Sequence, residues 1–87
     1  MKNPEKSLQE ESLEVLVQRL KAVDRHMDLV SDGSSPGSYN WLSTQAKSIG
    51  EELNRRGGVD LMVQVAEMAN ASNHIELAWD GVGGWMA

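Results

Sequence analysis

The stretch LEVLVQRLKAVDRHMDLV, residues 13–30, repeats apolar side chains at steps of three and four residues. This spacing places them on one face of an α-helix, which can be buried against another element. The face consists of Leu13, Leu16, Val17, Leu20, Val23, Met27 and Val30. Residues 32–37, DGSSPG, follow after Ser31. Because Gly and Pro continue a helix only at a cost, we expect this helix to end near residue 31.

Working outward, two more helical segments are expected. Leu42, Ala46, Ile49 and Leu53 follow one another at steps of four, three and four, and Gly57-Gly58 then stops the helix. A third apolar segment starts at Val59. The sequence therefore predicts an all-α fold, an up-down-up three-helix bundle, in a single domain of residues 1–87. The expected helices cover roughly 4–31, 38–56 and 59–80, followed by an aromatic tail at 81–87.

The third segment changes its apolar face partway along. Met62, Val65 and Ala69 define the first part of that face. Ile75 and Trp79 lie about a quarter turn away from it around the helix axis. Either one helix buries different sides along its length, or it breaks near residues 71–73. In the second case Asn73 would cap a short fourth helix.

Composition narrows the classes of function. The chain has 87 residues, no Cys and a formal net charge of −5. Residues 59–87 contain Asp60, Glu67, Glu76 and Asp80 and no Lys or Arg, which argues against binding to nucleic acid. Residues 1–6 lack the apolar run of a signal peptide, and no stretch approaches the ~20 apolar residues of a membrane helix. We therefore expect a cytoplasmic protein with no membrane partner and no cofactor.

A second set of apolar residues follows the first helix at a spacing of seven. These residues, which we call the seam, are Leu8, Val15, Ala22 and Leu29. They lie on the side opposite the main apolar face, which predicts a second burial surface, most simply the contact of a homodimer. The alternative is a scatter of exposed apolar residues, which is normal on protein surfaces.

The aromatic residues are expected to gather at one end of the bundle. In an up-down-up arrangement the end of the first helix, the start of the second and the end of the third meet there. This aromatic pole would contain Tyr39, Trp41, Trp79 and Trp85, with the carboxylate of Asp80. We expect Trp85 to fold back onto Trp41 and Tyr39. The pole would either close the core or form a patch for a cationic or amphipathic partner or a small ligand.

Two groups of residues are candidates for metal chemistry. Glu10-Glu11-Ser12-Leu13-Glu14 resembles the EExxE half of the Mg²⁺-binding signature of MazG-type nucleotide pyrophosphohydrolases. The resemblance implies that Glu10, Glu11 and Glu14 would share Mg²⁺ bound to phosphates; the ExxD half of the signature is absent from the following helix. His26 and His74 are expected at similar heights, where they could join a carboxylate as metal ligands.

Together these features favour a non-catalytic protein that acts through protein–protein interaction or self-assembly. The expected partner is a second copy, giving a homodimer, or another protein. A MazG-like enzyme and a small-ligand binder remain the alternative functions.

Overall fold

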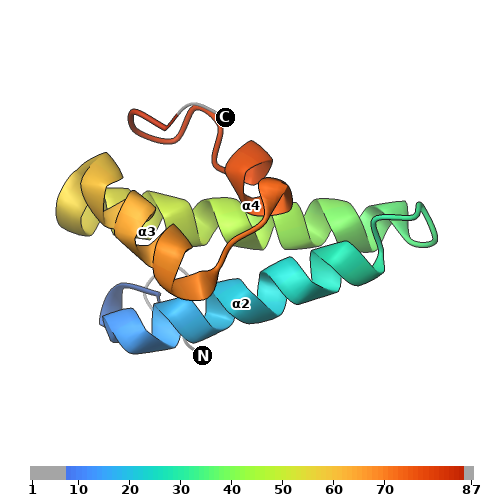
Figure 1. Cartoon of the computed structure of the whole chain (residues 1–87), viewed down its shortest axis with the longest axis horizontal. Helices are drawn as coiled ribbons and strands as arrows, with labels where there is room; N and C mark the ends of the chain where they lie inside the picture. Colours follow the sequence, from blue (N-terminus) through green and yellow to red (C-terminus); the bar gives the residue numbers. More distant parts are fainter. Residues whose placement is uncertain (1–7, 86–87) are drawn as a thin grey trace.

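The computed structural model describes residues 8–85, and the chain is helical through most of that range, with no strand in it. The predicted all-α class is confirmed. Helix α2 spans Leu13–Leu29, α3 spans Pro36–Ala69 and α4 spans Asn73–Ala78. In Figure 1, α2 and the first part of α3 lie side by side and run in opposite directions, joined by the loop after α2.

Helix α2 begins later than the sequence predicts. Residues 8–10 form a helical turn of their own, and Ser12 then adopts an extended conformation with φ −70° and ψ 159°. The Ser12 hydroxyl accepts a hydrogen bond from the backbone N–H of Val15, so this residue is the N-cap. The predicted continuous helix over residues 4–31 is therefore interrupted before Leu13. Its expected start at residue 4 lies outside the described residues.

Helix α3 begins two residues earlier than predicted. Pro36 occupies its first turn and Ser35 is the N-cap residue. Proline suits this position because the first helical N–H has no intrahelical partner and the ring already fixes a helical φ. In the preceding loop the carboxylate of Asp32 accepts a hydrogen bond from the N–H of Ser34, which forms a local turn.

Gly58 interrupts α3 and redirects the chain. Its backbone has φ 70° and ψ −166°, and the residues before and after it are helical. This conformation is open essentially only to glycine. In Figure 1 the chain turns in its yellow part. The second, orange part of α3 then runs obliquely back toward α2. The predicted stop at Gly57-Gly58 is thus present as a sharp kink inside one 34-residue element.

The predicted break in the last helix is also present. Helix α3 ends at Ala69, and Asn70 follows in the left-handed conformation with φ 51°. Helix α4 then starts at Asn73, with Ser72 as its N-cap and not Asn73, because the Ser72 hydroxyl accepts the N–H of His74. The alternative of one continuous helix over residues 59–80 is wrong.

The core follows the predicted apolar faces. From α2, Leu16, Val17, Leu20 and Met27 are buried, while Leu13, Val23 and Val30 are partly buried against them. All four predicted core residues of the second segment, Leu42, Ala46, Ile49 and Leu53, are buried. The last third of the chain adds Met62, Val65, Ala69, Ile75, Trp79 and Val82. Within residues 8–85, no helix combines the length and the apolar content that crossing a bilayer requires.

Candidate interaction surface

Helix α4 and the tail lie along the first part of α3. At the start of α3, the Tyr39 hydroxyl is 2.9 Å from Nδ1 of His74. Farther along, Nε1 of Trp79 donates a hydrogen bond of 2.6 Å to the carbonyl oxygen of Ala46. Beyond that, Gly83 lies against the side chain of Asn54. The chain from His74 to Gly83 therefore runs in the same direction as residues 39–54.

The tail packs on its own chain. Trp79 is fully buried, and Trp85 meets it edge-on with ring centroids 5.0 Å apart and an interplanar angle of 89°. Val82 is also buried, and its N–H donates to the carbonyl oxygen of Trp79. Nε1 of Trp85 donates to the carbonyl oxygen of Glu76. These contacts make the described part of the tail a cover over the middle of α3.

This arrangement corrects the predicted aromatic pole. The aromatic rings are spread along α3: Tyr39 contacts His74, Trp85 contacts Trp79, and Trp41 is 62% exposed. Trp85 folds back onto Trp79 and not onto Trp41 and Tyr39 as expected. The reason is the break at residues 70–72, which sends the chain back toward the kink at Gly58. A continuous helix would have carried Trp79 to the end of the bundle.

Asp80 follows α4 in an exposed turn, and its N–H donates to the carbonyl oxygen of Leu77. Asp80 directly follows Trp79, so the break at residues 70–72 that separates Trp79 from Trp41 applies to Asp80 as well.

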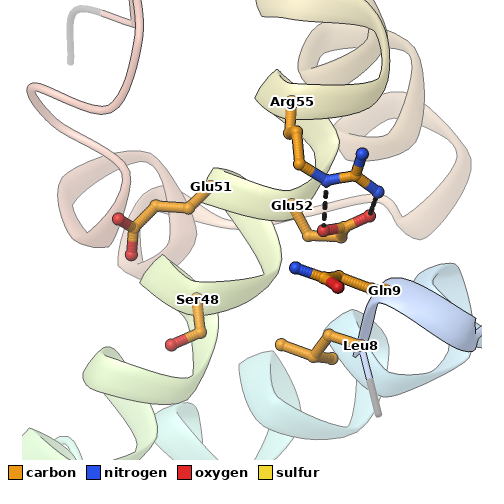
Figure 2. Close-up of a pocket in the computed structure, with 6 residues that line it drawn as sticks. All are labelled: Leu8, Gln9, Ser48, Glu51, Glu52 and Arg55. Atoms are coloured by element: carbon orange, nitrogen blue, oxygen red, sulfur yellow. Dashed lines mark hydrogen bonds and ion pairs between the residues drawn. The ribbon is translucent and has the colours of Figure 1, made fainter. Parts of the chain in front are cut away.

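A polar pocket of about 210 Å³ lies where the N-terminal turn meets α3. Figure 2 shows Leu8 and Gln9 on one side and the ion pair of Glu52 and Arg55 on the other, while the Glu51 carboxylate points away from that pair. Nε and Nη2 of Arg55 donate to Glu52 at 2.9 and 2.6 Å.

Glu52 is only 6% exposed, and both of its carboxylate oxygens accept hydrogen bonds from arginine side chains. The hydrogen bonds from Arg55, and to a lesser extent the one from Arg56, hold the pKa of Glu52 below its usual range, although burial acts in the opposite direction. The same pair raises the pKa of Arg55 above its usual value.

Arg56 joins this pair to the N-terminal turn. Its Nε donates to Glu52 at 2.5 Å, and its Nη2 donates to the carbonyl oxygens of Leu8 and Glu11 at 2.8 and 2.6 Å. The Leu8 carbonyl oxygen also accepts the backbone N–H of Glu11, and a cation is favourable beside these carbonyls because their negative ends point toward it. The charged groups around this pocket therefore fasten the N-terminal turn to α3.

The carboxylates of the EExxE motif do not share one helix. Glu10 lies in the N-terminal turn, Glu11 in the break that follows it, and Glu14 in the first turn of α2. Glu11 accepts a hydrogen bond of 3.1 Å from Arg19. The alignment on one helical face that the MazG resemblance implies is absent, because the backbone leaves the helical path at Ser12.

An apolar groove lies between α2 and the start of α3, and Trp41 stands at its centre. It consists of two adjoining hollows of about 320 and 330 Å³, which share His26, Trp41 and Leu42. We call it the Trp41 groove. Its apolar lining is Leu8, Ala22, Val23, Leu29, Val30, Leu42 and Ile49, and its polar lining is Arg19, His26, Ser38 and Gln45. The indole of Trp41 and the side chain of Leu29, at 62% and 64% exposure, project beside the hollows.

The groove brings most of the seam together with Trp41. Leu8, Ala22 and Leu29 of the seam line it, whereas Val15 does not line it and is 37% exposed. Leu8 also packs against the core. Three of the four seam residues therefore contribute to one wall of the groove, and the other wall comes from α3.

The groove carries little charge. Arg19, at one end, is paired with Glu11, and the lining from α3 contains no ionisable side chain. His26 is exposed and lines both hollows. His74 lies elsewhere, with Nε2 3.7 Å from the carboxylate of Asp28.

The two histidines thus belong to different sites. Among residues 8–85 no group of three or more His, Cys, Asp or Glu side chains is arranged to hold a metal ion. Comparisons with protein families, with curated proteins and with solved structures gave no match to this chain.

Proposed function

We propose that this chain is a non-catalytic assembly protein that forms a homodimer through the Trp41 groove. The observation that carries the proposal is the exposure of Trp41 and Leu29 beside two apolar hollows. Large exposed apolar side chains grouped in this way are typical of protein contact sites, and Trp is enriched at the centre of such sites.

The shape of the groove supports a second copy as its occupant. One surface carries both the projecting side chains and the hollows, so a two-fold axis can place Trp41 of each copy in a hollow of the other. Each hollow, at about 320 Å³ or more, exceeds the ~150 Å³ that accommodates a benzene ring in a protein interior. Ala22 and Leu29, seven residues apart on α2, suit packing against another helix.

The charge distribution supports the same occupant. The whole chain carries a net charge of −5, so the net charges of two copies repel each other. Along the groove the paired Arg19 and Glu11 cancel. Two copies that meet there bring no excess of like charge together.

Three further inferences belong to this proposal. The kink at Gly58 favours an up-down-up path in which residues 59–69 form the third helix of the bundle, since Met62 and Val65 are buried in the core. The cytoplasmic location expected from the sequence is also part of this proposal. Should the groove bind a different protein, the same side chains would form the contact.

The experiment compares two leucines of equal exposure. Leu29 is 64% exposed in the groove and Leu77 is 65% exposed on α4, outside it. Sedimentation equilibrium should show a dimer for the wild type. Trp41→Ser and Leu29→Ser should raise the dissociation constant at least ~30-fold, as loss of about 2 kcal/mol at a central contact does. Leu77→Ser should leave it unchanged. A wild type that stays monomeric at millimolar concentration would overturn the proposal, as would equal effects of the two leucine variants.

A further inference from the structure

Resting on the proposed homodimer, we propose that pairing through the Trp41 groove requires a neutral His26, so that the dimer dissociates as the pH falls from 7.5 to 5.5. His26 is exposed in the single chain and belongs to both hollows of the groove. It lies beside Trp41 and Leu29, the side chains that the proposed dimer buries.

The local sequence surrounds His26 with apolar neighbours on its own helix. Residues three and four positions away share its helical face, and these are Ala22, Val23, Leu29 and Val30. None of them can compensate a charged imidazolium. Asp24 and Asp28 are two positions away, which directs them to another side of α2. There Asp24 accepts hydrogen bonds from Ser72, and Asp28 lies near His74.

The other elements that line the groove add no compensating carboxylate. From α3 the lining contains Ser38, Trp41, Leu42, Gln45 and Ile49, none of which ionises near neutral pH. From the N-terminal turn it contains Leu8. Besides His26, the lining contains one ionisable side chain, the cation Arg19, which is bonded to Glu11. In a two-fold dimer the partner brings the same set.

Covering this surface therefore disfavours the charged imidazole. Removal of an ion from water without an opposite charge is costly, and the group instead gives up its proton. The free chain consequently binds more protons than the dimer, and mass action makes pairing weaker as the pH falls. Histidine is the side chain that changes charge between pH 5 and 8, and each dimer contains two copies of His26.

The two histidines of the chain supply a matched pair of variants. Sedimentation equilibrium at constant ionic strength would compare the wild type, His26→Gln and His74→Gln at pH 7.5 and 5.5. The wild type and His74→Gln should show a dissociation constant ~10- to ~100-fold higher at pH 5.5. His26→Gln should still dimerise and show less than about a threefold change. Far-UV circular dichroism would verify that every sample remains folded at both pH values.

The outcomes separate this inference from the function on which it rests. A wild-type dimer with the same dissociation constant at both pH values overturns the role of His26 and leaves the homodimer standing. A pH dependence that persists in His26→Gln, or disappears in His74→Gln, also overturns it. A wild type that is monomeric at both pH values overturns the homodimer and this inference together.

Discussion

Gly50 and Trp79 lie so close together that the indole occupies the space a β-carbon at position 50 would need. A Cβ on Gly50 would stand 2.6 Å from Nε1 and 2.7 Å from Cδ1 of the ring. The ring is also held by the hydrogen bond from Nε1 to Ala46. Because Trp79 is fully buried, it has no solvent-facing position to which it could move.

Gly50→Ala should therefore destabilise the chain by about 1–3 kcal/mol, as overpacking of a core does, even though alanine favours a helix by about 1 kcal/mol. Gly37→Ala is the control, since nothing lies within 4 Å of a Cβ there and its φ is not positive. That variant should be neutral or stabilising by up to about 1 kcal/mol. Urea unfolding measures both, and equal stabilities of the two variants would contradict the contact.

Trp85→Ala should lower the stability of the fold without changing its oligomeric mass. The indole packs edge-on against Trp79 and donates to the Glu76 carbonyl oxygen, so its removal uncovers a buried ring of the same chain. The expected cost is about 2 kcal/mol, from lost apolar burial and the ring pair. Urea unfolding and light scattering test it together. A change in mass with unchanged stability would instead identify Trp85 as a contact to another chain.

Glu52 should make the fold sensitive to acid. Its pKa is lower in the folded chain than in the unfolded chain, chiefly through the hydrogen bonds from Arg55. The stabilisation is therefore complete above the unfolded pKa of 4.5 and is lost as the pH falls through the lower folded value. Glu52→Gln should cost about 1.5–3 kcal/mol at pH 7 and should flatten the loss of stability below pH ~4.5.

The neighbouring Glu51 offers the control for this experiment. It is exposed and points away from the arginine pair in Figure 2, so Glu51→Gln should change stability by less than about 0.5 kcal/mol. Unfolding midpoints measured in urea from pH 7 to 3 compare the three proteins. If Glu52→Gln and the wild type lose stability in parallel below pH 4.5, the ion pair does not contribute as described.

Ser72 and Asp24 should be energetically coupled. The Asp24 carboxylate accepts from the backbone N–H and the hydroxyl of Ser72 at 2.9 and 2.5 Å, while the same hydroxyl caps α4. Ser72→Ala should cost about 1 kcal/mol as a lost N-cap. A double-mutant cycle with Asp24→Ala should give a coupling energy of about 0.5–2 kcal/mol.

Asp28→Ala provides the reference for that cycle. Asp28 lies one turn farther along α2, its side chain is 79% exposed, and its carboxylate lies 3.7 Å from Nε2 of His74. Its coupling to Ser72 should be within about 0.3–0.5 kcal/mol of zero. Equal coupling of Asp24 and Asp28 to Ser72 would show that the hydrogen bonds to Asp24 do not carry the interaction.

The apolar faces of the helices were readable from the sequence because burial repeats at the helical period. Leu16, Leu20 and Met27 on α2 and Leu42 and Ile49 on α3 all lie in the core. The break near residue 71 was also readable, because the apolar face shifts there. The direction that the chain takes after the left-handed Asn70 was not, since it depends on how α4 packs against α3. The aromatic pole was wrong for that reason.

The candidate surface was only half visible in the sequence. The seam marked Leu8, Ala22 and Leu29, but its second wall depends on how α3 lies against α2, which spacing does not determine. One overlooked signal existed. His26 follows Ala22 by four positions and precedes Leu29 by three, so helical spacing alone places it on the seam.

Gly58 also determines whether the fold is completed within one chain. Any other residue at this backbone conformation would be strained, and helical geometry there would extend the 34 residues of α3 into a rod about 50 Å long. Met62 and Val65 could then no longer return to α2 of the same molecule. Two chains with such straight helices would each bury these residues by packing residues 59–69 of one chain against α2 of the other. A residue that keeps position 58 helical should therefore favour a domain-swapped dimer over the self-contained chain.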